Sequence, residues 1–369
     1  MTSSFDGYKR LTLNGNPASL RVSSMDALRL TEVVIFDCDG VLIDSRESYD
    51  RAIEATVAYF FSTFMGLKLN LTFPTQQLVE TLRGTGQYNN DIDAAAAILV
   101  SIAASLPSDG VAKRLRSQSE AVEGLQETLD SEAFVRRASS LLDLASQGFR
   151  LFVKAVKAEF PDSAPCVNGL LERLAYPGGP ASSPLSRVFD EYYYGPTLLK
   201  QLHGLTPIVG CKTGLIESEK VLVSPETLRS LSSLLPKGRM GIVSGRSRLG
   251  TERTLGELMK FFQDGPLVFL EDHDAYINAT HPIPGKPSPE SLLLAIEHAE
   301  NSRAILYVGD SAEDLMMTSN ARLVRPNLAF CGVVGAAYSA RRDSMLSERG
   351  ADAIIKSVND LPALLSSVR

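Results

Sequence analysis

The chain has 369 residues, 44% of them hydrophobic, and a formal net charge of −6. A domain typically holds about 50 to 250 residues, so we expect more than one domain. The acidic balance argues against a nucleic-acid partner, which usually requires a basic surplus. The cysteines have neither metal-ligand spacing nor the density of a disulfide scaffold, which favours reduced thiols in the cytoplasm. They are Cys38, Cys166, Cys211 and Cys331.

The first thirty residues contain no apolar stretch of the kind that forms a signal peptide. Asn14-Gly15 between two short runs predicts a tight turn, so we interpret residues 1–30 as an N-terminal extension with a possible hairpin. The longest apolar run, Ala94 to Leu106, is shorter than the roughly 20 residues that cross a bilayer. We therefore expect a cytoplasmic protein without a membrane partner.

The most informative motif follows the apolar run Val33 to Phe36, which predicts a buried strand. Asp37 and Asp39 are two residues apart, so their carboxylates share one face of an extended segment. Gly40 lets the backbone turn sharply next to a bound ion or phosphate. This pattern indicates an aspartate nucleophile beside an aspartate acid/base. The alternative is a strand end followed by a helix cap.

Residues 46–219 have helical patterning interrupted by loops rich in glycine, proline and serine, and we expect a large all-helical cap domain there. Helix candidates begin at Ser45, Asn90, Val111, Ser131 and Thr197. Arg83 opens the most polar stretch of this region, which could line a substrate entrance. The alternative is a connecting loop in which Asn90 or Asp91 caps the next helix.

Short apolar runs alternate with helical segments in the last part of the chain. The strand candidates are Met240 to Val243, Leu267 to Leu270, Ala304 to Val308 and Leu328 to Val334. This alternation predicts a Rossmann-like α/β fold, a parallel sheet flanked by helices. Residues 31–45 and 220–369 would form this core, and the stretch before Ser45 would supply its central strand.

Polar groups that suit a phosphate follow two of these apolar segments. Ser244, Gly245 and Arg246 stand at the end of one strand candidate, where a hydroxyl and a glycine can hold phosphate oxygens. Lys286 lies between glycine and proline, and an ammonium fixed there could neutralise a phosphoryl group. Taken singly, Ser244 could be a turn residue and Lys286 a solvated charge.

Acidic residues cluster beyond the strand candidate that ends at Val308. Asp310 and Asp314 provide carboxylate oxygens, which suit a hard cation such as Mg²⁺. Asp314 alone could be a carboxylate in the first turn of a helix. Asp272 and Asp274, in a loop after another strand, could support the same cation, although solvated loop carboxylates are commoner.

Together these four segments resemble the motifs of the haloacid dehalogenase superfamily, in its phosphoglycolate-phosphatase-like branch, whose helical cap follows the first motif. The resemblance covers residues 33–45 and about 220–369. It implies that Asp37 attacks phosphorus and forms an aspartyl phosphate, while Asp39 protonates the leaving oxygen and then activates water. Members that cleave carbon–halogen bonds lack the second aspartate and transport ATPases carry threonine there, so Asp39 favours a phosphatase or phosphomutase.

The resemblance also implies the remaining roles. Ser244 and Lys286 would hold the phosphoryl oxygens, and Mg²⁺ would be the cofactor. Its site would consist of Asp37, the main-chain carbonyl of Asp39, Asp310 and Asp314. Asp314 would support the ion directly or through a neighbour, and Glu313 could take its place.

We therefore predict a Mg²⁺-dependent phosphatase that hydrolyses a small phosphorylated metabolite through an aspartyl-phosphate intermediate. One alternative is a phosphomutase that acts on a sugar phosphate with the same core. An alternative of a different class is a phosphate-sensing binding protein that keeps the site without turnover. The metabolite and the oligomeric state stay open, because the sequence does not place the cap residues that would select a substrate.

Overall fold

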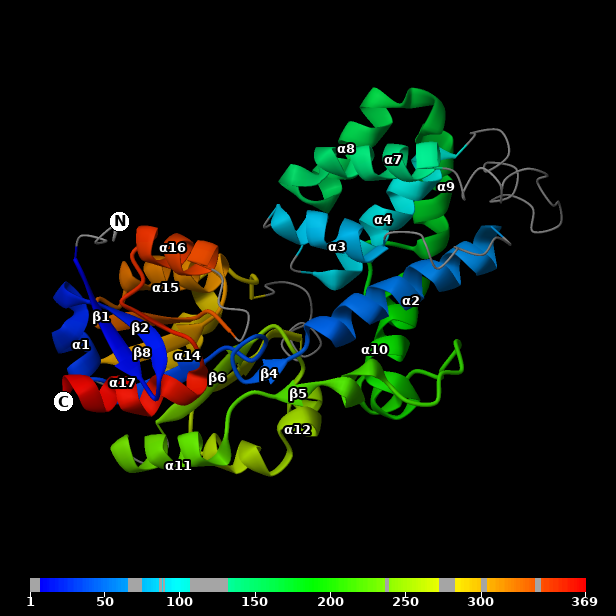
Figure 1. Ribbon diagram of the computed structural model, residues 1–369. Helices are drawn as coiled ribbons and strands as arrows, with labels where there is room; N and C mark the ends of the chain where they lie inside the picture. Colours follow the sequence, from blue (N-terminus) through cyan, green and yellow to red (C-terminus); the bar gives the residue numbers. More distant parts are fainter. Residues whose placement is uncertain are drawn as a thin grey trace. The chain divides into compact units, whose positions relative to one another are not determined.

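The computed structural model describes residues 7–65, 75–85, 88, 90–106, 132–235, 239–271, 283–299, 304–335 and 340–369 (Figure 1). The chain divides into two compact units. The core unit combines Met1–Arg46 with Glu219–Arg369, and the helical unit is Glu47–Ser218. The core unit is therefore built from two segments of sequence that the helical unit separates.

An eight-stranded sheet forms the centre of the core unit. In order across the sheet, its strands are β1 (Tyr8–Leu13), β2 (Asn16–Arg21), β10 (Ala353–Ile355), β9 (Leu328–Val333), β8 (Ile305–Gly309), β3 (Val33–Phe36), β6 (Met240–Ser244) and β7 (Leu267–Phe269). Among the six strands from β10 to β7, every adjacent pair is parallel, and β3 lies between β8 and β6. The structure confirms the predicted Rossmann-like α/β fold.

The N-terminal residues extend this sheet. β1 and β2 pair antiparallel, and β2 also pairs antiparallel with β10. Asn14 and Gly15, the turn between β1 and β2, have positive φ values of 51° and 81°. Two successive residues with positive φ match the right-handed twist of a hairpin, which explains the Asn-Gly pair in the sequence. Residues 1–30 thus add two strands to the edge of the core sheet.

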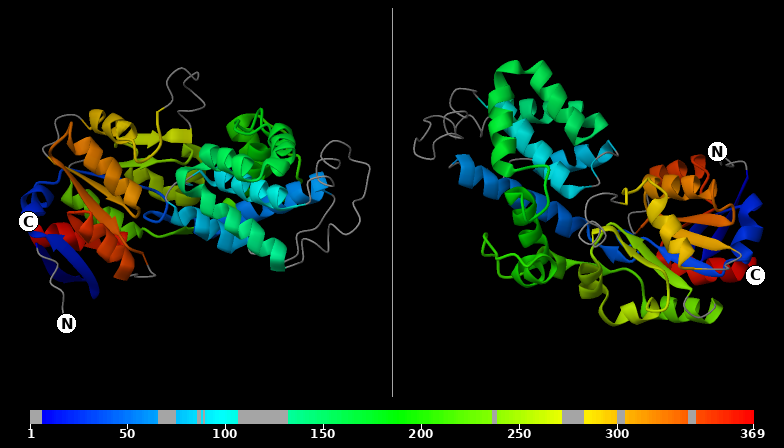
Figure 2. Two further views of the ribbon diagram at one scale, coloured as in Figure 1. Left: turned by 90° about the horizontal axis from the view of Figure 1, so that it is seen from above. Right: turned by 180° about the vertical axis from the view of Figure 1, so that it is seen from behind.

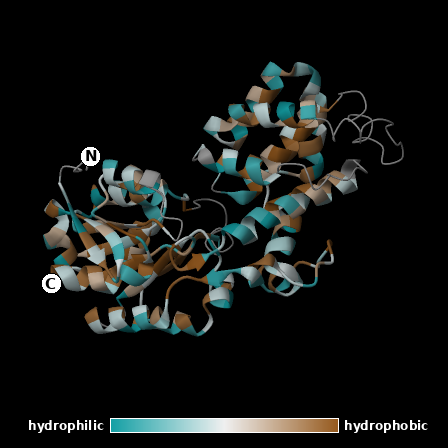
Figure 3. Ribbon diagram, in the orientation of Figure 1, coloured by the Kyte–Doolittle hydropathy of each residue, from teal (hydrophilic) through white to brown (hydrophobic). Residues whose placement is uncertain are grey.

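Helices cover both faces of the sheet (Figures 1 and 2). The helices of the core unit are α1 (Met25–Arg29), α11 (Pro225–Leu234), α12 (Arg248–Leu255), α14 (Glu290–Glu297), α15 (Ala312–Arg322), α16 (Ala340–Glu348) and α17 (Leu361–Val368). Val34 and Phe36 of β3 pack with α1, α11, α12 and α17, whereas Val33 and Ile35 pack with α14, α15 and α16. Side chains alternate along a strand and helices cover both faces, so all four are buried, and the inner strands of the sheet are largely brown in Figure 3.

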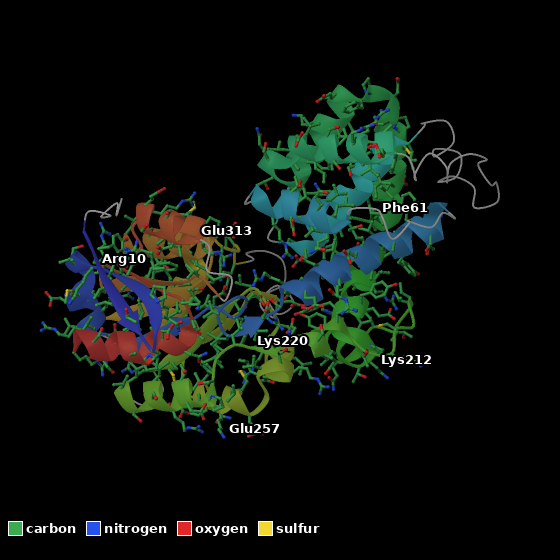
Figure 4. All side chains as sticks on the ribbon, viewed as in Figure 1. Arg10, Phe61, Lys212, Lys220, Glu257 and Glu313 are labelled. Carbon is green, nitrogen blue, oxygen red and sulfur yellow. The ribbon has the colours of Figure 1, made fainter. Side chains whose placement is uncertain are left out.

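The two stretches of chain that connect the core unit to the helical unit also pair with each other. β4 (Ile43–Asp44) follows the first acidic motif, and β5 (Lys220–Val221) follows the helical unit in the sequence. They form a two-stranded antiparallel sheet, in which Asp44 lies opposite Lys220, a residue labelled in Figure 4. The chain thus leaves and re-enters the core unit at neighbouring strands.

Among its described residues, the helical unit contains helices and no strands. They are α2 (Arg46–Met65), which begins at the boundary, α3 (Thr75–Gly84), α4 (Asp91–Ser105), α7 (Glu132–Leu141), α8 (Phe149–Glu159), α9 (Ala164–Leu174) and α10 (Pro184–His203). α4 is the central helix, because residues 94 to 105 are all buried and it contacts α7, α8 and α9. The Asn90 side chain caps α4 by accepting a hydrogen bond from the Ile92 amide at 2.9 Å.

One helix of this unit differs from the prediction. α10 begins at Pro184, whereas the sequence analysis placed a helix start at Thr197. The helix is interrupted at Gly195, with φ 77°, directly before Pro196, so Thr197 lies just after the kink. The helix candidate at Val111 lies outside the described residues. Among the described residues, no helix is both long and apolar enough to span a membrane.

Candidate active site

The first acidic motif forms a compact turn at the carboxyl end of β3. The carbonyl of Cys38 accepts hydrogen bonds from the amides of Leu42 and Ile43 at 2.8 and 2.9 Å. Gly40 has φ 74°, a value that favours glycine. This turn reverses the chain within a few residues and holds Asp37 directly after the buried strand.

Glycine at position 40 also permits a close approach between two motifs. A Cβ atom added to Gly40 would stand 2.1 Å from Oδ2 of Asp310. No side chain fits into that distance, so the Asp310 carboxylate lies against the bare backbone of the first motif. The glycine that the sequence analysis linked to a turn therefore has a second role in bringing Asp310 near Asp37.

Three carboxylates converge where β3 and β8 end. Asp37, Asp310 and Asp314 each offer an oxygen, and these oxygens all lie within 4.8 Å of one another. β3 and β8 are adjacent and parallel, so their carboxyl ends meet at one edge of the sheet. Carboxylate oxygens at this spacing suit a hard divalent cation, and the donor set fits Mg²⁺.

Asp314 is the most constrained member of the cluster. Its Oδ2 accepts hydrogen bonds from the Ser311 hydroxyl at 2.6 Å and the Ser311 and Asp310 amides at 3.1 and 3.2 Å. Its Oδ1 accepts from the Tyr307 hydroxyl at 3.1 Å. Burial alone would raise the pKa of Asp314, but Lys286 and Ser311 outweigh it and lower the pKa. Asp314 belongs to the cluster, whereas Glu313, labelled in Figure 4, is not among its members.

Lys286 connects the nucleophile candidate to Asp314. Its ammonium lies 2.7 Å from Oδ1 of Asp37 and 2.6 Å from Oδ1 of Asp314, with 14% of the side chain exposed. Burial by itself would lower the pKa of Lys286, but the two carboxylates raise it well above its usual range. Lys286 is therefore a fixed positive charge at the edge of the acidic cluster, where it can neutralise a phosphoryl oxygen.

The two other carboxyls of the cluster hold protons more tightly than ordinary aspartates. Burial, followed by the negative charge of Asp314, raises the pKa of Asp310 to about 7. Burial likewise raises the pKa of Asp37 well above its usual range, although the Lys286 ammonium lowers it. Burial disfavours an ionised carboxyl that lacks a counterion, so a cation bound among these groups would favour the carboxylate forms.

Ser244 and Gly245 lie at the end of β6, the neighbour of β3 on its other side. The Ser244 side chain is buried, and its hydroxyl accepts a hydrogen bond from the Arg246 amide at 3.3 Å. Gly245 is exposed, and the space that a Cβ atom would occupy there is open. An exposed backbone without a side chain lets a phosphate approach the main-chain amides closely.

Arg246 is placed differently from the sequence expectation of a phosphate contact. Only 2% of its side chain is exposed. Its Nη1 donates a hydrogen bond to Oδ1 of Asp39 at 2.8 Å, and its Nη2 donates to Glu219 at 2.7 Å. The Ser45 hydroxyl also donates to Oδ1 of Asp39, at 2.5 Å. Arg246 is thus engaged with acidic side chains of the core unit rather than available to an incoming phosphate.

The other predicted residues lie away from this cluster or beyond description. Arg83 belongs to the helical unit, where it pairs with Asp50 at 2.8 Å and Asp91 at 2.9 Å. Its predicted contact with substrate stays a prediction. Asp272 and Asp274 lie outside the described residues. Burial raises the pKa of the Cys38 thiol to about 12, so this thiol stays protonated and is a poor nucleophile at neutral pH.

Sequence reasoning missed three side chains of the site. Glu219 pairs with Arg246, Tyr307 donates to Asp314, and Arg342 lies 3.5 Å from Oδ2 of Asp310. Glu219 and Arg342 sit in stretches without any motif, so their positions follow only from the folded structure. Tyr307 had a weak signal, because it is the one residue with a hydroxyl inside the apolar run Ala304 to Val308.

No protein-family model and no curated protein matches the chain. Among solved structures, one from the Northeast Structural Genomics Consortium is 18% identical, has a TM-score of 0.66, and is matched over 91% of this chain and 99% of its own. Phosphatase Tt82 from Thermococcus thioreducens is 21% identical, with a TM-score of 0.50, and is matched over 86% of this chain and 99% of its own. At these identities the likeness establishes a shared fold.

Proposed function

We propose that this chain, whose fold is that of the haloacid dehalogenase-like hydrolases, is a Mg²⁺-dependent phosphatase acting on a small phosphorylated metabolite. The observation that carries the proposal is the convergence of Asp37, Lys286, Asp310 and Asp314 at the carboxyl ends of two adjacent parallel strands. Ligands of such sheets bind at that edge, which supports a reaction there.

In the proposed mechanism Asp37 is the nucleophile. A carboxylate oxygen of Asp37 attacks phosphorus, a new phosphorus–oxygen bond forms, and the bond between phosphorus and the ester oxygen breaks. Asp39 gives its proton to the departing ester oxygen. The product of this half-reaction is an aspartyl phosphate on Asp37 and a free alcohol.

The second half-reaction returns the enzyme to its starting state. Asp39, now a carboxylate, takes a proton from water, and the water oxygen attacks the same phosphorus atom. The bond between phosphorus and Asp37 breaks, and inorganic phosphate leaves. Acid/base help of this kind typically contributes about 10² to 10⁴-fold to the rate. Asp39 has 37% of its side chain exposed, which supports proton exchange with substrate and water.

The phosphoryl group needs positive charge and hydrogen-bond donors around its oxygens. Ser244, the Gly245 backbone and Lys286 are the groups proposed to hold it. Mg²⁺ would be held by Asp37, Asp310 and the main-chain carbonyl of Asp39, with Asp314 fixing the surrounding groups. When bound, the ion supplies charge neutralisation for the phosphoryl oxygens.

The helical unit is proposed to act as the cap that selects the substrate. The core-unit groups named above serve the phosphoryl transfer itself, so we assign recognition of the rest of the metabolite to the helical unit. Glu47–Ser218 follows the first motif directly in the sequence, as a cap of this family would. Within it, Arg83 stays the predicted substrate contact.

The decisive experiment is an assay of phosphate release from a broad panel of phosphate esters, with Mg²⁺ and with EDTA. We expect release that needs Mg²⁺ and is abolished in Asp37→Asn. Asp44→Asn is the matched control, because Asp44 lies in β4, shortly after the same turn, with 39% of its side chain exposed. Conversion of a sugar phosphate without release would identify a phosphomutase, and binding without any conversion would identify a sensing protein.

A further inference from the structure

Arg246 is a buried cation that the mechanism above does not use. Its guanidinium makes hydrogen bonds to two acidic residues, Asp39 and Glu219. A buried charge is tolerated only when it is paired and hydrogen-bonded. The guanidinium therefore cannot turn toward a substrate phosphate without giving up its ion pair with the buried Glu219 carboxylate.

Glu219 holds the same guanidinium that donates to Asp39. It is fully buried, and its two carboxylate oxygens accept from Nη1 at 3.2 Å and Nη2 at 2.7 Å of Arg246. Thr254 donates a further hydrogen bond to Oε2 at 2.8 Å. This bidentate pairing fixes the plane of the guanidinium, so Nη1, which also donates to Asp39, is fixed as well.

The fixed donor is directed at one oxygen of Asp39. Arg246 and Ser45 both donate to Oδ1, and no other hydrogen bond to Asp39 occurs among the described residues. The second oxygen, Oδ2, is thus left to exchange a proton with the substrate. An acid/base group must keep its reactive oxygen in one place, because a misplacement of about 1 Å can cost about 10²-fold in rate.

We propose that Arg246, held by Glu219, is a positioning residue that orients Asp39 as the acid/base. This inference rests on the proposed phosphatase function. Ser45 and Glu219 directly flank the paired strands β4 and β5, so Asp39 is held at the point where the chain leaves and re-enters the core unit. The position of the acid/base group thus depends on both connecting stretches.

The test compares esters that differ in their need for an acid. An alkyl phosphate requires protonation of its leaving oxygen. The leaving group of p-nitrophenyl phosphate is p-nitrophenolate, a stabilised anion that needs little protonation by an acid. For Arg246→Met we expect kcat/KM for glycerol phosphate to fall about 10²-fold more than kcat/KM for p-nitrophenyl phosphate. Arg246→Lys keeps one donor and should recover part of the loss. The inhibition constant of inorganic phosphate should not change.

Two further variants keep the result interpretable. Arg246→Met removes the positive charge that faces Glu219, so the double variant Arg246→Met with Glu219→Leu removes both buried charges and should fold while showing the same larger loss on glycerol phosphate. Arg248→Met is the matched control, because Arg248 is 58% exposed and forms an i,i+4 ion pair with Glu252 at 2.7 Å.

Equal losses on both esters would overturn the positioning role. Weaker inhibition by inorganic phosphate would overturn it too, since it would place Arg246 at the phosphoryl group. Failure of the wild-type protein to release phosphate from any ester would instead overturn the proposed function, and this inference with it.

Discussion

Asp310→Asn should stabilise the metal-free core unit while abolishing catalysis. Burial and the charge of Asp314 raise the pKa of Asp310 from its usual 3.8 to about 7. At 1.36 kcal/mol per pH unit, a difference of about 3 units corresponds to about 4 kcal/mol. Because the pKa of Asp310 is higher in the folded protein than in the unfolded chain, this contribution to the free energy of unfolding is present at acidic pH. It is lost as the pH rises through about 7. Asparagine carries no charge at any of these pH values, so the Asp310→Asn protein does not lose this stability.

The difference between the two proteins should therefore grow with pH. Between about pH 5.5 and pH 7 the wild type loses about 2 kcal/mol relative to Asp310→Asn, and little changes above that. Hydrogen exchange of amides in β3 and β8, measured in EDTA, reports the free energy of unfolding of the core unit separately from the helical unit. Saturating Mg²⁺ should stabilise the wild type and leave Asp310→Asn unchanged.

Asp26→Asn is the control, because the Asp26 side chain is 85% exposed and should show no such pH-dependent gain. A less stable Asp310→Asn protein in EDTA at alkaline pH would contradict the reasoning. So would a stability difference that stays constant across this pH range, because it would mean that the Asp310 carboxyl does not titrate near neutrality.

Three further outcomes follow from single contacts. Gly40→Ala should lose at least about 10²-fold in kcat and fold less stably, because its Cβ would stand 2.1 Å from the Asp310 carboxylate at φ 74°; normal kinetics would contradict this. Cys211 should react with iodoacetamide before the buried thiol of Cys38, whose pKa burial raises to about 12, as peptide mapping would reveal. Glu191→Gln should weaken the hydrogen bonds that the buried carboxylate accepts from the three backbone amides of residues 208–210, at a cost of about 2 to 4 kcal/mol, and speed trypsin cleavage at Lys212; unchanged cleavage would refute this.

The sequence predicted the parts of the fold that local pattern determines. The apolar runs before Asp37, Ser244 and Asp310 are β3, β6 and β8, since a strand buried on both faces reads as a continuous hydrophobic stretch. Asn14-Gly15 predicted the turn between β1 and β2 because the dipeptide accepts positive φ. The pairing of β2 with β10 was not predictable, because more than three hundred residues separate the partners.

The candidate site likewise contains groups that the sequence predicted and groups that it did not. Groups within a motif, such as Asp37 and Asp39, were visible because their spacing is fixed along the chain. Arg246 was visible as a residue but was assigned to phosphate, since its partner Glu219 lies in a stretch with no pattern. A buried ion pair depends on tertiary contacts between distant segments, and those leave no periodic signal in the sequence.

In the proposed mechanism, each of the two catalytic aspartates pairs with a cation that a second carboxylate also contacts. Asp37 shares Lys286 with Asp314, and Asp39 shares Arg246 with Glu219. In both cases the second carboxylate has no exposed side-chain surface. The buried carboxylate holds the cation in place whether or not the catalytic aspartate is charged.

Proposed catalysis requires such an arrangement, because the nucleophile loses its negative charge when phosphorylated and the acid/base loses its own when protonated. A cation paired only with the catalytic aspartate would move as the charge on that carboxylate changed. The fully buried second carboxylate keeps the cation fixed through both half-reactions. Replacing either buried carboxylate, Asp314 or Glu219, by its amide should therefore impair turnover more than ground-state binding of inorganic phosphate. A loss confined to phosphate binding would exclude this role.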